Sequence, residues 1–171
     1  MTPPITLIGS FVSDTDRLFD DLMDSIEWDE RMSSRRTASF GVAYNYSQMQ
    51  YPSAPMPPPL EALCDKLRSE LGFRPNNCLA SHYVDGTSSM GFHSDDTAKL
   101  ASGTGVGIVS LGANRHIIFR NKADSSIELS YELPAGSLLY MPGAMQREWL
   151  HAIPKTPSTG GRISLTFRLL I

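Results

Sequence analysis

The chain has 171 residues, of which 41% are hydrophobic and 19% are charged, so it can bury a sizeable core and we expect one domain over residues 1–171. Fifteen Lys and Arg stand against 18 Asp and Glu, and this net charge of −3 argues against a strong grip on duplex nucleic acid. No stretch approaches the roughly 18 apolar residues of a membrane span, which excludes an integral membrane protein with helical spans.

The N-terminal region is predicted to form a short strand followed by an amphipathic helix. The strand is expected over residues 5–8 and the helix over residues 14–26, with Ser13 as its N-cap. One side of this helix carries four apolar residues, Leu18, Leu22, Met23 and Ile26. Such a helix supports a core and carries no chemistry of its own.

A second amphipathic helix is expected near residues 60–71. Its leucines recur at helical spacing and Gly72 fits a helix end; these leucines are Leu60, Leu63, Leu67 and Leu71. The proline-rich run at residues 51–59 is interpreted as a rigid, extended connection into this helix, because the flanking composition gives no sign of a domain boundary.

After Asn77 every predicted element is a strand. The strands are short and are separated by Gly, Asn, Asp and Pro, and they are expected at residues 78–84, 105–111, 116–120, 127–132, 137–141 and 162–170. This spacing is typical of a jelly roll with helices packed outside it. The predicted fold class is therefore mainly β with flanking helices.

The chemistry of the chain is indicated first by a His-x-Asp pair, His93 and Asp95, on a predicted strand. A second usable histidine, His151, lies far downstream. Two imidazoles and one carboxylate can form the facial triad of a non-haem Fe(II) oxygenase, which leaves three metal positions open. The pair alone is weak evidence, since a loop histidine hydrogen-bonded to a nearby carboxylate gives the same pattern. His82 and His116 are interpreted as structural or surface histidines.

The predicted terminal strand alternates between two kinds of side chain. Period two puts the polar ones on one face and Ile163, Leu165 and Phe167 on the other; the polar ones are Arg162, Ser164, Thr166 and Arg168. Arginines that face a barrel interior need an anion there, and a dicarboxylate such as 2-oxoglutarate would satisfy them. The alternative is that this face is the solvent side of an edge strand.

The order of these motifs resembles the AlkB family of Fe(II)/2-oxoglutarate dioxygenases, over about residues 35–171. The family pattern is Asn-x-Tyr, then Gly, His-x-Asp, a distal His and Arg-x-Asn-x-Thr-x-Arg. The residues that match it here are Tyr83, Gly86, His93, Asp95, His151, Arg162, Thr166 and Arg168. The segments at residues 136–141 and 149–154 also resemble the family. The resemblance implies a double-stranded β-helix with the metal between two sheets.

The resemblance also implies a role for each of these residues. His93, Asp95 and His151 would bind Fe(II). Tyr83 and Arg162 would hold the distal carboxylate of the co-substrate 2-oxoglutarate, and Arg168 would lie near its metal-chelating end. Two departures from the family pattern are Ser81 and Ser164, which stand where the family has Asn. Their shorter side chains would reach 2-oxoglutarate directly or through a water molecule, at a cost of about 1 kcal/mol for each imperfect bond.

A second part of the resemblance concerns the substrate. Asp96 matches an acidic position that contacts the target base in nucleobase-demethylating members. Residues 42–47 resemble their nucleotide-recognition lid (about residues 35–52), in which Tyr44 and Tyr46 would contact and stack on the base. Ordinary alternation in a β-strand also explains these two tyrosines. The implied reaction consumes O2 and 2-oxoglutarate, yields succinate and CO2, and releases an N-methyl group as formaldehyde.

Three functions remain open on the sequence alone. The favoured one is a demethylase of N-alkylated bases, such as 1-methyladenine or 3-methylcytosine, in single-stranded DNA or RNA. The second is a small-molecule hydroxylase or N-demethylase, which the acidity and the absence of a basic cluster in residues 155–161 support. The third is a metal-binding jelly roll without catalysis, which would need a broken triad or no acid site. Scattered basic residues, including Arg35, Arg115 and Arg120, are mostly interpreted as solvated surface.

The compartment is predicted from the N-terminus and the cysteines. The N-terminus lacks the cationic start and apolar run of a secretory signal. Cys64 and Cys78 are the only cysteines, and buried, reduced thiols are expected at both. We therefore expect a cytoplasmic protein, acting as a monomer.

Overall fold

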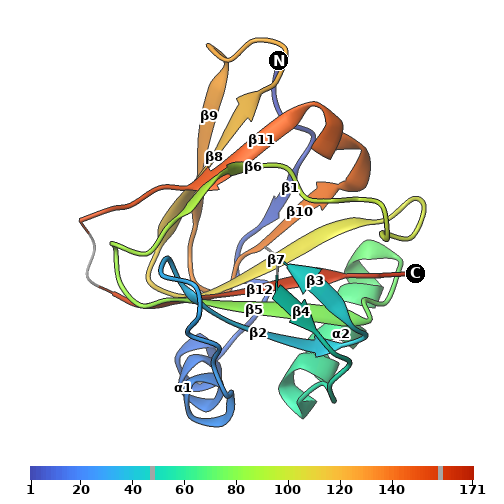
Figure 1. Ribbon diagram of the computed structural model, residues 1–171, viewed down its shortest axis with the longest axis vertical. Helices are drawn as coiled ribbons and strands as arrows, with labels where there is room; N and C mark the ends of the chain where they lie inside the picture. Colours follow the sequence, from blue (N-terminus) through green and yellow to red (C-terminus); the bar gives the residue numbers. More distant parts are fainter. Residues whose placement is uncertain (47–48, 158–159) are drawn as a thin grey trace.

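The computed structural model describes residues 1–46, 49–157 and 160–171, and it shows two antiparallel sheets with two helices against one of them (Figure 1). This is the predicted double-stranded β-helix, so the expected fold class is confirmed. No helix of the described part of the chain is long and apolar enough to cross a membrane.

The larger sheet carries the helices on its outer face. Its central strand β12 is flanked by β7 and β5, and on its helix side Ile163, Leu165 and Phe167 join the core that the helices cover. The opposite face points toward the smaller sheet, as period two predicts. The strands in spatial order are β1 (Thr6–Ile8), β10 (Leu138–Pro142), β7 (Gly105–Gly112), β12 (Arg162–Arg168), β5 (Asn77–Tyr83) and β2 (Arg36–Gly41).

The two helices cover the sheet much as their apolar spacing predicts. Helix α1 (Thr15–Ser25) buries Leu22, and α2 (Pro58–Leu71) begins inside the proline run and ends at Gly72, whose φ of +83° suits glycine. The predicted Ser13 cap is wrong. Asp14 occupies the N-cap position with a φ of +52°, and no side chain caps the helix.

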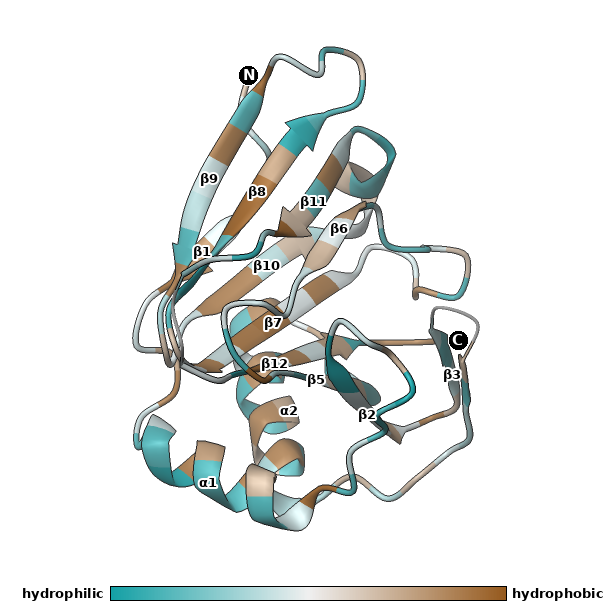
Figure 2. Cartoon of the chain, turned by 60° about the vertical axis from the view of Figure 1, so that its left-hand side comes forward, coloured by the Kyte–Doolittle hydropathy of each residue, from teal (hydrophilic) through white to brown (hydrophobic). Residues whose placement is uncertain are grey.

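The smaller sheet consists of β6 (Met90–His93), β11 (Trp149–Ile153), β8 (Arg115–Asn121) and β9 (Glu128–Leu133), in that spatial order. Its inner face adds Ile117, Phe119 and Leu133 to a second core between the sheets. Polar and apolar residues alternate along β9, which has one face in solvent (Figure 2). The prediction that only strands follow Asn77 is wrong at one place, because the 3-10 helix η1 (Gly143–Arg147) precedes β11.

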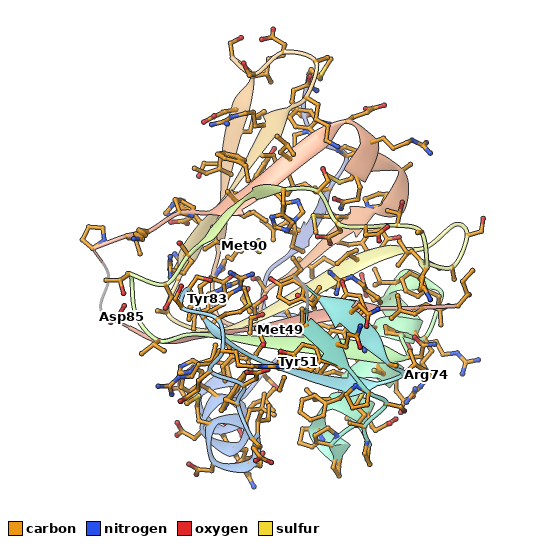
Figure 3. The ribbon with its side chains drawn as sticks, viewed as in Figure 1. Met49, Tyr51, Arg74, Tyr83, Asp85 and Met90 are labelled. Carbon is orange, nitrogen blue, oxygen red and sulfur yellow. The ribbon has the colours of Figure 1, made fainter. Side chains whose placement is uncertain are left out.

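Within the predicted lid segment, β2 is followed by a small hairpin of β3 (Tyr44–Tyr46) and β4 (Met49–Tyr51). The hydroxyl of Tyr51 ties the hairpin to the larger sheet, through hydrogen bonds with Thr37 on β2 and with Asp29 (Figure 3). Ser47 and Gln48 of the predicted lid, and Ser158 and Thr159 of the segment before β12, lie outside the described residues.

His82 points from β5 toward the helix side of the larger sheet, away from the space between the sheets, so it is a structural histidine. Its ring packs against Phe19 of α1 and against Trp28, and its Nδ1 is buried without a partner among the described residues. Burial, with the positive charge of Arg36, lowers the pKa of His82. Below a pH of about 6.5 the His82 side chain takes up a proton more readily in the unfolded chain than in the folded one. The free energy of unfolding therefore decreases as the pH is lowered through this range.

We therefore expect the melting temperature of the protein to fall more steeply between pH 7.5 and pH 5.5 than that of His82→Phe. Calorimetric melting curves across this range measure the difference, and His116→Phe is the control because His116 is exposed. Parallel pH profiles for the wild-type protein and His82→Phe would show that His82 does not titrate on unfolding.

Candidate active site

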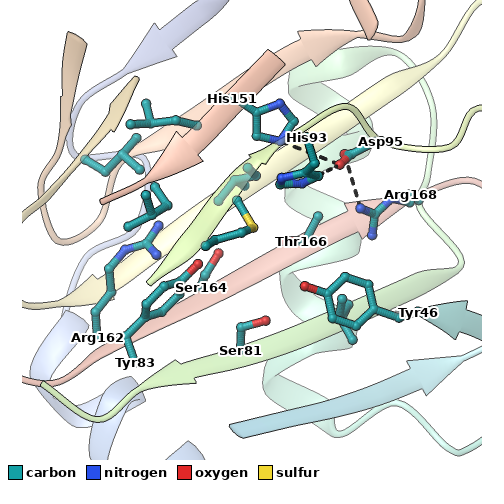
Figure 4. A pocket seen from close by; sticks show the side chains of 16 residues that line it. Tyr46, Ser81, Tyr83, His93, Asp95, His151, Arg162, Ser164, Thr166 and Arg168 are labelled. Carbon is teal, nitrogen blue, oxygen red and sulfur yellow. Dashed lines mark hydrogen bonds and ion pairs between the residues drawn. The ribbon is translucent and has the colours of Figure 1, made fainter. Parts of the chain in front are cut away.

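Strand pairing brings the two predicted metal-binding histidines together. His93 on β6 and His151 on β11 are directly opposite each other in the ladder, and their ring centroids are 4.3 Å apart (Figure 4). Asp95 completes the group: its Oδ1 lies 3.3 Å from His93 Nε2 and 3.5 Å from His151 Nε2. One ligand atom from each residue lies within 4.8 Å of the others, so the three can hold one metal ion.

Asp95 lies two residues beyond the end of β6. The predicted strand therefore contains His93 but not Asp95. The Gln146 side chain accepts the Asp95 backbone N–H at 2.8 Å, and Arg168 donates to Oδ2 at 3.2 Å. Burial would raise the pKa of Asp95, but Arg168 and the two histidines outweigh burial and hold this pKa well below its usual range. The carboxylate is therefore ionised, with Oδ1 facing both imidazoles.

The His93 ring is oriented for a metal at Nε2. Its Nδ1 lies 2.9 Å from the carbonyl of Gly91, and an Nδ1–H donated there leaves the lone pair on Nε2. Burial lowers the pKa of His93, yet the hydrogen bonds to Asp95 and Gly91 outweigh it and raise the pKa overall. The His151 ring is 2% exposed and packs against Phe119 with a centroid distance of 5.9 Å. Both rings are thus fixed by protein groups before any metal binds.

A cationic site lies in the same pocket, at its other end. Arg162 is 1% exposed, its Nη2 donates to Ser110 Oγ at 3.0 Å, and its Nε and Nη1 have no partner among the described residues. Burial lowers the pKa of this guanidinium, although Tyr83 opposes the shift. A buried cation with free donors calls for an anionic ligand, as the strand pattern predicted.

Cross-strand register explains why the other predicted acid-site residues line this pocket. On the ladder between β12 and β5, Arg162 is opposite Tyr83, and Ser164 is opposite Ser81. Directly opposed residues project to the same face of a sheet, so all four face the pocket that His93, Asp95 and His151 also line. The alternative of a solvent-exposed edge face is wrong, because β12 is central and buried along its whole length.

The mouth of the pocket holds the three predicted substrate residues. Tyr44 and Tyr46 have ring centroids 6.4 Å apart and nearly parallel planes, and Tyr46 also lines the inner pocket. Asp96 is exposed at the same opening and accepts the Ala98 backbone N–H. The guanidinium carbon of Arg168 lies 4.9 Å from the Tyr44 ring centroid, which links the lid to Asp95.

Two arginines that the sequence suggested were solvated are buried instead. Arg35 donates to the Tyr46 hydroxyl and to the carbonyl of Ser89, at the mouth of the pocket. Arg115 is 1% exposed and lies behind Tyr83. Sequence reasoning also missed Gln146, which supports Asp95 from η1. For Arg115 a signal existed, because it alternates with Ile117 and Phe119 on the inner face of β8.

His93, Asp95 and His151 open toward a pocket that also holds a buried arginine with two unpartnered nitrogens, and this is the combination expected of a ferrous oxygenase that binds an oxo acid. Comparison with known proteins agrees, since a family model, the 2OG-Fe(II) oxygenase superfamily, matches residues 19–168. The chain belongs to this superfamily and, within it, to the AlkB family. Fe(II) and 2-oxoglutarate are therefore the metal and co-substrate of its family, and the residues present fit both.

Two curated relatives and one solved structure illustrate the similarity. The chain is 32% identical to "DNA oxidative demethylase ALKBH2" of Mus musculus, over 80% of this chain and 62% of the relative. It is 30% identical to "Alpha-ketoglutarate-dependent dioxygenase alkB homolog 3" of Rattus norvegicus, over 96% of this chain and 63% of the relative. The chain thus spans about three-fifths of these relatives' length. The solved structure "The structure of OsALKBH1" shares the fold, with a TM-score of 0.73, 17% identity and coverage of 98% and 99% of the two chains.

Proposed function

We propose that the protein is an Fe(II)/2-oxoglutarate-dependent dioxygenase that removes methyl groups from N-alkylated nucleobases, such as 1-methyladenine or 3-methylcytosine, in DNA or RNA. One observation carries the proposal: the triad, an unpaired buried arginine and a pair of lid tyrosines all meet at one pocket. The name of the relative ALKBH2, a DNA oxidative demethylase, supports the same reaction.

Each residue of the pocket would have a defined task. His93, Asp95 and His151 would bind Fe(II). Arg162 and Tyr83 would hold the distal carboxylate of 2-oxoglutarate, with Ser81 and Ser164 beside its chain and Arg168 near its metal-chelating end. Charge-assisted bonds from Arg162 are the strongest of these contacts, because its free Nε and Nη1 are already desolvated.

The bound metal, with 2-oxoglutarate and O2, supplies the oxidising power to convert an N–CH3 group into N–CH2OH, while 2-oxoglutarate becomes succinate and CO2. The chain positions the methyl group and excludes water. A base lying against Tyr46 would point its edge toward His93, because Tyr46 lines both the mouth and the inner pocket. The N–CH2OH product breaks its C–N bond, with the hydroxyl proton going to the ring nitrogen, and releases formaldehyde.

The polymer we propose is single-stranded. The net charge of −3 does not favour a duplex grip, and a base in a single strand needs no unpairing before it enters a pocket. The same acidity supports a second candidate, a small-molecule hydroxylase or N-demethylase on this scaffold. We further propose one catalytic domain that acts as a monomer in the cytoplasm. In support of the cytoplasm, Cys64 and Cys78 are buried free thiols, as expected in a reducing compartment.

The experiment that tests the function combines the Fe(II)-loaded protein, 2-oxoglutarate and O2 with single-stranded oligonucleotides that carry 1-methyladenine or 3-methylcytosine. Formaldehyde in equal amount to succinate, absent in His93→Ala, is the expected result. Succinate without loss of the base methyl groups would contradict base demethylation, and it would support the small-molecule candidate.

Asp96→Ala separates substrate recognition from co-substrate chemistry. Asp96 lies at the mouth with Tyr44 and is not part of the triad, so we expect a loss of about tenfold or more in methylated-base turnover. Succinate formed without substrate should change little. Asp124→Ala, at another exposed Asp that accepts bonds from its own turn, is the matched control. Equal losses of both activities in Asp96→Ala would show that Asp96 does not act through the substrate.

A further inference from the structure

Arg115 is a buried cation to which the proposed reaction assigns no role. It begins β8, its side chain turns inward with those of Ile117 and Phe119, and it is 1% exposed. A guanidinium remains charged even when burial lowers its pKa, as it does here. A charged group kept this far from water needs compensation from its surroundings.

The hydrogen bonds that the Arg115 guanidinium donates all go to backbone carbonyls. Arg115 Nη2 donates to Ser88 at 2.8 Å and to Pro154 at 2.7 Å, and Nη1 donates to Asp85 at 3.3 Å. Its Nε has no partner in the described ranges. The Asp85 carboxylate accepts the backbone N–H and the hydroxyl of Thr87 at the exposed turn after β5, so it makes no hydrogen bond to Arg115, although its charge opposes the burial that lowers the pKa of Arg115. The carbonyls accept from Nη1 and Nη2, but they leave Nε without a partner and the guanidinium without a carboxylate ion pair among the described residues.

The charge of Arg115 is close to the proposed acid site. Its guanidinium carbon lies 5.5 Å from the centroid of the Tyr83 ring, and the guanidinium carbon of Arg162 lies 4.9 Å from the same centroid. Two buried cations thus share one aromatic ring. Burial is the main cause that lowers the pKa of Arg162, and the positive charge of Arg115 lowers it further. An anion bound at Arg162 relieves this repulsion, so its binding gains from both cations.

We propose that Arg115 is a positioning residue for the acid site, one that orients Tyr83 and adds a second positive charge behind Arg162, so that the pocket selects 2-oxo acids with a distal carboxylate. This inference rests on the proposed function, since it concerns how that site recognises its co-substrate. Arg115 does not line the pocket and acts through Tyr83 and Arg162.

The same contacts explain why the side chain at position 115 is an arginine. Its guanidinium bridges the connection between β5 and β6 and the segment after β11. A second hydrogen bond between these segments is donated by the Thr156 backbone N–H to the Gly86 carbonyl. The first segment leads from Tyr83 into the strand of His93, and the second follows the strand of His151. One planar side chain therefore spans both connections next to the acid site.

Binding to the Zn(II)-loaded protein, which does not turn over, tests the proposal. The two ligands are 2-oxoglutarate, measured by titration calorimetry, and 2-oxopentanoate, measured by displacement of 2-oxoglutarate; the second has the same chain length without the distal carboxylate. The variants are Arg115→Gln, which keeps N–H donors and removes the charge, and Arg115→Lys, which keeps the charge. Arg120→Gln is the matched control, because Arg120 lies on the outer face of β8 paired with exposed Glu128.

We expect Arg115→Gln to lower the preference for 2-oxoglutarate over 2-oxopentanoate by about tenfold, and Arg115→Lys and Arg120→Gln to keep it within about threefold of wild type. A general structural role of Arg115 would lower the affinities for both ligands by the same factor. If the two affinities in Arg115→Gln are unchanged, or fall by the same factor, the proposal is overturned. If Arg115→Gln does not fold, Arg115→Lys decides: a kept preference supports the proposal and a lost one overturns it. A wild-type protein that binds no 2-oxoglutarate would instead overturn the proposed function itself.

Discussion

Replacement of His151 by alanine is expected to abolish both metal binding and substrate oxidation. His151 is buried on β11 opposite His93, and its Nε2 faces the same Asp95 oxygen as His93 Nε2 does. Loss of groups that only orient a metal ligand commonly costs 10–100-fold in affinity, so loss of a ligand itself should exceed about 100-fold. Activity with Fe(II) present in micromolar amounts should then fall below detection.

Metal affinity is best measured with Co(II), whose visible absorption reports the ligands directly, alongside succinate formation with Fe(II). His116→Ala is the control, because His116 is exposed and its nearest carboxylate, that of Glu132, lies 3.7 Å away at the surface. A melting curve confirms that each variant is folded. Co(II) binding by His151→Ala with wild-type affinity would show that the metal is held elsewhere.

The residues that face the pocket from β12 could be predicted from sequence because strand alternation is strict. Period two placed Arg162, Ser164, Thr166 and Arg168 on one face, and the structure puts all four on the pocket. The two ladders that flank β12 fix its orientation from both sides, so no local irregularity can turn these side chains away. The fold class followed from the same regularity, repeated in short strands between turn residues.

The position of Asp95 shows where strand alternation stops being informative. His93 and Asp95 would share a face of a regular strand, but β6 ends at His93 and its pairing with β11 shifts between the His93 and Met90 partners. Asp95 is held instead by Gln146 and Arg168, which are 51 and 73 residues away in sequence. Long-range contacts of this kind leave no local pattern in the sequence.

Burial of arginine was the least predictable property of the site. Arg35 and Arg115 carry charges that favour water, and a charged residue near a turn is usually solvated. Arg115 is buried because three backbone carbonyls from two distant connections converge on it. The inward positions of Ile117 and Phe119 on β8 contained the clue to its direction, although they gave none about its partners.

Replacement of Arg162 by alanine is the most direct test of the acid site, and we expect the dissociation constant of 2-oxoglutarate to rise by about 100-fold. Removal of one partner from a buried, hydrogen-bonded charge pair typically costs about 2–5 kcal/mol, and tenfold corresponds to about 1.4 kcal/mol. The free protein should lose little stability from the lost interactions, because Arg162 donates one hydrogen bond to Ser110 while its Nε and Nη1 have no partner among the described residues. The variant even removes one of two mutually repelling cations.

Titration of the Zn(II)-loaded variant with 2-oxoglutarate measures the change, and Arg74→Ala is the control, since Arg74 forms surface ion pairs with Glu61 and Asp65. Metal affinity should stay close to that of the wild-type protein, because the triad lies at the other end of the pocket and Arg168, which supports Asp95, is untouched. Unchanged co-substrate binding in Arg162→Ala would place the carboxylate elsewhere. The charge on Arg162 would then lack its ligand, and a buried guanidinium with two unpartnered nitrogens would be a net cost to the fold.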